Sequence, residues 1–188
     1  MTQTRPRGRP VQGKGVTRHE ILDAAMQLLD EGGGKGLSMR ALAARLGVTP
    51  MSLYHHVDDR AGLLLALSDR VYGVVLDAMA EPAGQRADIR TLLTRYYDAV
   101  GRHPQLTLEI FAEPAAFAGV SRKITDLLTS LLAAITPDHV LWRDILIDHA
   151  HGSGLALSAA RGDQQQAELM RAQYRVALDC LLERLVGN

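Results

Sequence analysis

The chain has 188 residues, with 21 Lys and Arg side chains against 21 Asp and Glu, and 47% of its residues are apolar. This length is enough for a hydrophobic core, so neither a disulfide framework nor a structural metal is needed on size grounds. Cys180 has no second cysteine to pair with, which excludes an intrachain disulfide scaffold. No stretch approaches the roughly 20 uncharged apolar residues of a membrane-spanning helix, and no apolar segment follows the basic N-terminus as in a secretory signal. We therefore expect a cytoplasmic protein with no membrane partner.

Charge is unevenly distributed along the chain. Residues 1–60 hold nine Lys and Arg against six Asp and Glu, whereas residues 61–188 hold twelve against fifteen. Residues 1–15 are rich in Pro, Gly and Arg, lack acidic side chains and show no apolar period, which is typical of a disordered arm. A basic end on a nearly neutral body favours a polyanionic partner at that end only.

Apolar residues recur at helical spacing once the arm has ended. Thr17 and Glu20 have the spacing of a capping box and predict the start of a helix with one apolar stripe. The glycine-rich segment 31–36 is expected to end that helix.

Two short helices are predicted next. Ser38 is expected to cap the first of them, and Gly47 to close it in a left-handed turn. Thr49 then offers a capping hydroxyl to a further helix, and Pro50 suits its first position because no N–H is missed there. This helix is expected to end near residue 57.

The rest of the chain keeps the helical period. Helices or helical stripes are predicted over residues 60–80, 89–100, 124–135, 136–161 and 163–185. No segment shows the period of two that a strand requires, and no repeat of 20–50 residues is visible. The predicted fold class is therefore all-α.

Residues 38–56 show the pattern of a helix-turn-helix. Ala43 is small where the second helix is expected to cross close by, and Gly47 supplies the turn. The outward face of the second helix would carry short polar and aromatic side chains, which suit the base edges and phosphates of a DNA major groove.

At this point the sequence resembles a known family. The segments that carry the resemblance are 21–25, 37–43, 46–48, 53–57 and 60–64. In this order they closely resemble the DNA-binding part of TetR-family transcriptional repressors over residues 17–65. The turn Arg102-His103-Pro104 resembles the tetracycline-repressor branch of that family.

This resemblance implies a homodimer that blocks a palindromic operator in double-stranded DNA and leaves it when a small-molecule effector binds. It implies that Arg40 reads a base, and Met51 could contact a thymine methyl group. The other expected DNA contacts are Thr49, Pro50 and Ser52 in the recognition helix, Tyr54, His55, His56 and Arg60 on phosphates, and Thr17 at the start of the first helix.

The N-terminal arm also has a DNA-binding pattern. Arg5, Arg7 and Arg9 flank a glycine between two prolines, which resembles an AT-hook that lies in a narrow A·T-rich minor groove. The alternative is a solvated tail with only non-specific attraction to phosphates. If the arm dominated binding, the protein would be a ligand-independent architectural DNA binder rather than an operator-specific repressor.

Three further patterns suggest a phosphate-binding loop, a metal site or a nucleophilic serine, and none of them matches the pattern that the function requires. The glycine-rich segment 32–36 lacks the strand and the Ser or Thr of a phosphate-binding loop. Asp144, Asp148 and His151 share a helix face, but a polar pocket lining is a better interpretation than a metal site. Ser153 lies between two glycines without the strand of a nucleophile elbow. We therefore expect no enzyme activity, no metal and no cofactor.

The C-terminal part is expected to hold the effector. Its aromatic and polar side chains suit an apolar pocket with a few converging polar groups, although each alone could be ordinary core. The expected pocket residues are Tyr96, Tyr97, His103, Phe111, Phe117, Trp142 and Asp148. Cys180 is expected to serve in packing.

The expected organisation has three parts: a disordered basic arm at residues 1–15, a helix-turn-helix domain at 16–60, and a helical ligand-binding and dimerisation domain at 61–188. The last two long helices are expected to pair with those of a second copy in a four-helix bundle. A tilt of the long fourth helix would then couple effector binding to the spacing of the recognition helices.

Overall fold

The computed structural model describes residues 15–77, 79 and 83–185. Within these ranges the regular elements are nine α-helices and two short 3-10 helices, and no strand is present, so the predicted all-α class is confirmed. Arg5, Arg7 and Arg9, the basis of the AT-hook prediction, lie outside the described residues. None of the described helices is long and apolar enough to cross a membrane.

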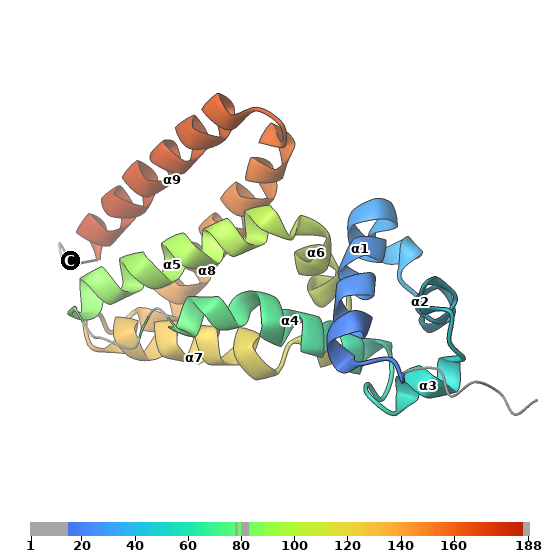
Figure 1. The fold of residues 1–188 in the computed structure, drawn as a ribbon. Helices are drawn as coiled ribbons and strands as arrows, with labels where there is room; N and C mark the ends of the chain where they lie inside the picture. The colour runs from blue at the N-terminus through green and yellow to red at the C-terminus, as the bar shows by residue number, and fades with distance from the viewer. Residues whose placement is uncertain (1–14, 78, 80–82, 186–188) are drawn as a thin grey trace, which may run out of the picture.

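Three N-terminal helices form one end of the molecule (Figure 1). They are α1 (Arg18–Gly36), α2 (Met39–Leu46) and α3 (Pro50–Tyr54). The capping box that begins α1 is present, because Thr17 accepts a hydrogen bond from the N–H of Glu20 and the Glu20 carboxylate accepts one from the N–H of Thr17. The sequence therefore identified the start of this end of the fold correctly.

A helical body fills the other end, and α4 runs from the N-terminal helices into it (Figure 1). Its elements are α4 (Arg60–Asp77), α5 (Gln85–Arg102), α6 (Pro104–Ala112), η1 (Pro114–Ala116), α7 (Gly119–Ala133), α8 (His139–Leu157), η2 (Ser158–Ala160) and α9 (Gln164–Arg184). The Asp59 carboxylate accepts the N–H of Gly62 at 2.7 Å, as expected for a residue that caps α4.

Several helix ends differ from the sequence prediction. The glycine-rich segment does not stop α1 at once, because helix continues to Gly36 with a break at Gly33, where φ is 60° and ψ is −161°. Helix α8 begins at His139 and gives way to a 3-10 turn after Leu157, so it is shorter at both ends than expected. Helix α4 ends at Asp77.

Helices α5 and α8 approach each other closely near their C-terminal ends, where Gly101 and Gly154 each face the other helix. A Cβ atom added at Gly154 would lie 2.8 Å from the Cβ of Val100 and 2.9 Å from the carbonyl oxygen of Tyr97. A Cβ at Gly101 would lie 3.2 Å from the carbonyl oxygen of Gly154. The backbones therefore approach too closely for side chains, and Gly154 serves packing within the chain. Gly152, in contrast, faces open space.

Polar groups fasten α4 to the body. Buried hydroxyl pairs and one carboxylate make these contacts: Ser68 with Ser121 at 2.7 Å, Tyr72 with Thr107 at 2.7 Å, and Asp69 accepting from the N–H of Val120 at 2.8 Å. Each contact joins α4 to α6 or α7. The orientation of α4 is therefore set by directional bonds as well as by its apolar face.

Candidate nucleic-acid interface and ligand site

The helix-turn-helix is built from an apolar joint between two short helices. The Ser38 hydroxyl accepts the N–H of Ala41 at 3.1 Å and begins α2. Gly47 follows α2 in the left-handed conformation, with φ 65° and ψ 29°, which only glycine adopts at little cost. Leu42, Ala43 and Leu53 are buried in the joint.

The opposite face of α3 is open to solvent. Met51 has 66% of its surface exposed, so its side chain is free to contact a partner. Tyr54 is also exposed, and so is Arg40, the second residue of α2. The remaining expected contacts fall into two groups: Thr17, Thr49, Pro50 and His55 are exposed, and Ser52 and His56 are half-buried.

Three hydroxyl groups among the expected DNA contacts already form hydrogen bonds within the chain. Thr49 does not cap α3 with its side chain, contrary to expectation; its hydroxyl oxygen lies 3.1 Å from that of Ser52. The Thr17 hydroxyl donates to Glu20 at 2.7 Å within the capping box. These groups would have to exchange or share these hydrogen bonds to reach DNA.

Arg60 lies in a different setting from the one the family resemblance implied. Its guanidinium forms an ion pair with the carboxylate of Glu109 on α6, and its Nε donates to the carbonyl oxygen of Leu37 at 3.4 Å. Only 35% of the Arg60 side chain and 19% of the Glu109 side chain are exposed. Arg60 therefore joins the helix-turn-helix end to the body. No sequence signal pointed to Glu109, which is 49 residues away.

Two of the expected ligand residues, Tyr96 and Phe111, both contact His151 in the body. His151 is not one of the expected ligand residues. The His151 ring lies 5.2 Å from the Tyr96 ring and 4.6 Å from the Phe111 ring, both edge-on. The Tyr96 hydroxyl and His151 Nε2 are 2.6 Å apart. Tyr72, also absent from the expected set, lies 5.4 Å from Tyr96 by ring centroids. We call Tyr72, Tyr96, Phe111 and His151 the aromatic cluster.

The other expected ligand residues are dispersed. Tyr97 faces the opposite side of α5 and stacks on Tyr174 of α9 at 3.9 Å. His103 lies at the turn between α5 and α6. Phe117 and Asp148 are exposed, and Trp142 is half-buried against the core. Residues adjacent in sequence point to opposite sides of one helix here, which composition alone does not reveal.

Burial keeps the aromatic cluster uncharged. It lowers the pKa of His151 to about 4, although nearby Asp148 acts in the opposite direction. Burial also raises the pKa of Tyr72 to about 12, against the effect of its hydrogen bond to Thr107, and raises that of Tyr96. At neutral pH the cluster is therefore a set of neutral rings with hydrogen-bonding edges, which suits an apolar molecule with few polar groups.

The lowered pKa of His151 predicts a loss of stability in acid. Between pH 6.5 and 4 the unfolded chain binds a proton at this residue and the folded chain does not, so stability falls as the pH drops through this window. We expect about 2 kcal/mol of the loss between pH 7 and pH 5 to come from His151. Urea titrations of wild type and His151→Gln at both pH values measure it. Burial also lowers the pKa of His103 and His149, so the variant retains part of the slope. Identical slopes for the two proteins would contradict the prediction.

No metal site forms around the acidic and histidine side chains of α8. Among the described residues, no group of three His, Cys, Asp or Glu side chains is arranged to hold a metal ion. His151 instead faces Tyr96 and Phe111, whereas Asp148 and Asp144 are exposed. Of these three side chains, His151 is the one that contacts aromatic rings of other helices.

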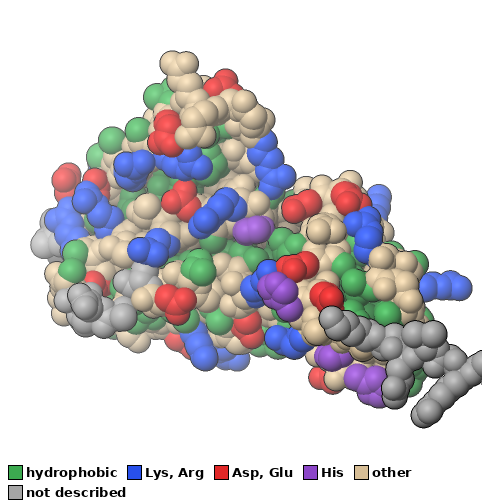
Figure 2. Space-filling model, viewed as in Figure 1, with side chains coloured by type: hydrophobic (Ala, Val, Ile, Leu, Met, Phe, Trp, Pro, Cys, Tyr) green, Lys and Arg blue, Asp and Glu red, His purple; other side chains and the backbone are tan. Residues whose placement is uncertain are grey.

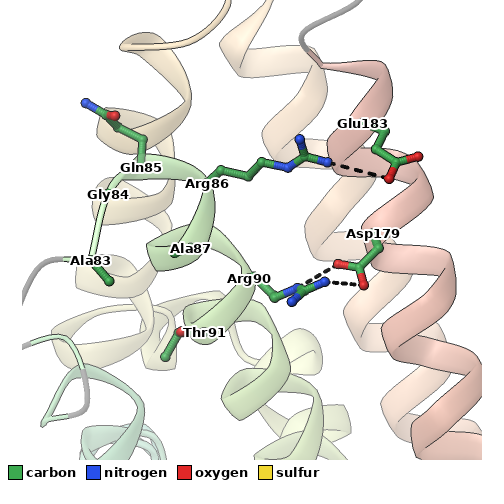
Figure 3. A pocket seen from close by; sticks show the side chains of 9 residues that line it. All are labelled: Ala83, Gly84, Gln85, Arg86, Ala87, Arg90, Thr91, Asp179 and Glu183. Atoms are coloured by element: carbon green, nitrogen blue, oxygen red, sulfur yellow. Dashed lines mark hydrogen bonds and ion pairs between the residues drawn. The ribbon is translucent and has the colours of Figure 1, made fainter.

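A cavity of about 790 Å³ lies apart from this cluster, between the N-terminal half of α5 and the end of α9 (Figure 3). Arg90 and Arg86 reach from α5 across it toward α9, as Figure 3 shows. Arg90 Nε donates to Asp179 Oδ1 at 2.6 Å, and Arg86 Nη2 lies 4.0 Å from Glu183 Oε1. Its basic side chains are thus matched by acidic ones, and none of the expected ligand residues lines it.

An N-terminal helix-turn-helix with an exposed second helix, joined by a long helix to a helical body, defines the class of helix-turn-helix DNA-binding proteins. Residues 21–67 match the family described as "Bacterial regulatory proteins, tetR family". This match covers the helix-turn-helix end of the chain, which is therefore similar to the DNA-binding part of that family.

Relatives outside this match are also DNA-binding regulators by name. The HTH-type transcriptional repressor DrrR1 of Streptomyces coeruleorubidus is 30% identical over 185 residues, which is 92% of this chain and 65% of that protein. The chain thus spans somewhat less than two thirds of the length of this relative. The crystal structure of Mycobacterium smegmatis BioQ superimposes with a TM-score of 0.74 at 25% identity, over 92% of this chain and 98% of that one. A further structure, of BioQ with its double-stranded DNA operator, matches at 24% identity with a TM-score of 0.67, over 92% of this chain and 99% of that one.

Proposed function

We propose that this protein is a sequence-specific DNA-binding transcriptional regulator that represses by occupying an operator. The exposed face of α3, with Met51 and Tyr54 uncovered, together with the exposed Arg40 on α2, is the observation that carries the proposal. The match of residues 21–67 to the TetR family and the DNA-bound state of the similar BioQ structure support it. The alternative, an architectural binder that relies on the basic arm, is not favoured, because the relatives are named as repressors.

A homodimer formed through α8 and α9 is part of the proposal. Both helices carry large apolar side chains on their outer faces: Leu141 and Ile145 on α8, and Leu169 and Val176 on α9. In a single copy these side chains face solvent, and a second copy would bury them. A two-fold axis would set the distance between two recognition helices, so we expect an approximately palindromic operator.

A small-molecule effector that releases the operator completes the proposal. The aromatic cluster is the candidate site, because it is neutral, combines side chains from α4, α5, α6 and α8, and lies next to the bonds that fasten α4. Tyr72 belongs to the aromatic cluster, because its ring contacts Tyr96, and also to the bonds that fasten α4, because its hydroxyl forms a hydrogen bond with Thr107. An effector that binds better after a shift of α4 would move the helix-turn-helix end.

The test is a fluorescence-polarisation titration against DNA from immediately upstream of the protein's own gene, at physiological salt. Tight, saturable binding that survives excess competitor DNA is expected. Weak binding that disappears with added salt, and is lost when residues 1–15 are deleted, would favour the architectural alternative. The same assay screens effectors by release of the labelled DNA.

We expect replacement of Arg40 to reduce sequence specificity at one operator position. If Arg40 reads a base, Arg40→Ala weakens operator binding by about 1–3 kcal/mol and relaxes the preference for one base pair. Arg95→Ala serves as the control, because Arg95 is an exposed arginine on α5 in the body. If operator and scrambled DNA remain equally well distinguished by Arg40→Ala, Arg40 does not read a base.

A further inference from the structure

A cavity of about 490 Å³ lies at the junction between the helix-turn-helix end and the body, bounded by α1, α4 and the end of α5. Its volume falls within the roughly 300–1,000 Å³ of small-molecule sites in proteins. Figure 2 shows histidine, basic and acidic side chains gathered along this boundary. The cavity is separate from the aromatic cluster, since none of its lining residues belongs to that cluster.

Apolar side chains from three helices form much of the cavity wall. Met26 comes from α1, Val71 from α4 and Ala99 from α5. Val74, at the next turn of α4, also lines the cavity and keeps 47% of its surface exposed, so it lies at the mouth. This wall can bury the apolar body of a ligand, and burial of that body would stabilise the complex.

The charged groups of the cavity leave one cation without a counter-charge. Arg70 is neutralised by Asp23, with 2.6 Å between Nη2 and Oδ1, and His19 adds a second contact to Asp23 at 3.2 Å. Arg102 uses only its Nε, which donates to the carbonyl oxygen of Asp98 in its own helix at 3.2 Å. Among the described residues, the two terminal nitrogens of Arg102 have no hydrogen-bond or ion-pair partner.

His103, beside Arg102, adds a neutral polar group. Burial, together with the charges of Arg102 and Arg161, lowers its pKa, against the effect of Asp30. Its Nδ1 is buried without a hydrogen-bond partner among the described residues. The cavity therefore offers one guanidinium and one neutral imidazole beside an apolar wall, and its one carboxylate is already paired.

We propose that this junction cavity binds a small organic anion, with its apolar body against Met26, Val71 and Ala99 and its carboxylate or sulfonate at Arg102. A guanidinium presents two parallel N–H donors that match such a group. Because the wall combines α1 with α4 and α5, a bound anion holds the helix-turn-helix end at its present angle to the body. Binding is then coupled to that angle, in addition to any effector at the aromatic cluster.

The test uses the full chain without DNA, so its outcome is independent of the proposed operator binding. Isothermal titration with 1-naphthoate and with decanoate measures affinity for a flat and a chain-like anion. We expect at least one of them to bind, and Arg102→Gln to weaken that binding about tenfold or more. Arg95→Gln is the matched control, an exposed arginine of the same helix outside the cavity, and it should bind as wild type does.

A second variant locates the binding. Arg102 also lines a neighbouring cavity of about 510 Å³, whereas Val74 lines only the junction cavity of these two. Val74→Trp, at an exposed position that tolerates a larger side chain, should fill the mouth and abolish binding, while circular dichroism shows an intact helical fold. The proposal is overturned if neither anion binds wild type, or if Val74→Trp or Arg102→Gln binds as tightly as wild type does.

Discussion

Gly154→Ala should lower the free energy of unfolding by about 2 kcal/mol, because one added methyl group forces α5 and α8 apart. Its Cβ would lie 2.8 Å from the Cβ of Val100 and 2.9 Å from a main-chain oxygen, and the oxygen cannot move aside as a flexible side chain would. Urea unfolding followed by far-ultraviolet circular dichroism measures the change.

Gly152→Ala is the matched control for this variant. It lies half a turn away on the same helix, and a Cβ there meets nothing within 4 Å. Alanine costs less backbone entropy than glycine in a helix, so this variant should gain about 0.5–1 kcal/mol. If Gly154→Ala loses stability and Gly152→Ala gains it, the close approach of α5 and α8 at Gly154 is the cause. Equal losses for both variants would show that the clash at Gly154 is not responsible.

Removal of Arg60 should have the second-largest effect. Arg60→Met removes the cation that pairs with the Glu109 carboxylate, which has little access to solvent. Removal of one partner from a fully buried ion pair lowers the free energy of unfolding by about 3–5 kcal/mol. Because both side chains keep some exposure, we expect roughly 2 kcal/mol of lost stability after allowing for solvent screening. Urea unfolding in the absence of DNA measures it.

A double variant separates the ion pair from a DNA contact. Arg60→Met combined with Glu109→Gln should recover part of the stability, since the unpaired charge is then gone. If Arg60 instead binds a phosphate, Arg60→Met weakens DNA binding without lowering stability, and Glu109→Gln leaves both unchanged. The two functions thus give different patterns over the same three proteins.

The local elements were largely predictable from the sequence. Capping at Thr17, Ser38 and Asp163, the left-handed turn at Gly47, and the apolar stripes of the long helices depend on residues three or four apart. Such spacings are visible in a sequence because the helix repeats every 3.6 residues. The helix-turn-helix, which is built from these elements, could therefore be predicted with its buried and exposed faces.

The contacts between helices were not predictable in the same way. The pairing of Arg60 with Glu109 and that of Tyr96 with His151 join residues 49 and 55 positions apart, and no local period encodes them. Aromatic composition alone does not distinguish Tyr97 from Tyr96, although Tyr97 faces α9. The sequence shows His151 only as a polar residue on a helix face, and its aromatic neighbours are visible only in the fold.

The ways in which α4 and α8 are attached to the body imply an uneven distribution of stiffness. Helix α8 meets α5 backbone to backbone at Gly154, so neither can slide without main-chain collision. Helix α4 is attached by hydroxyl pairs such as Ser68 with Ser121, which can be exchanged for water at a cost near 1 kcal/mol each. Amide hydrogen exchange should therefore be slowest in α5 and α8, released only by global unfolding, while α4 opens in smaller and more frequent excursions.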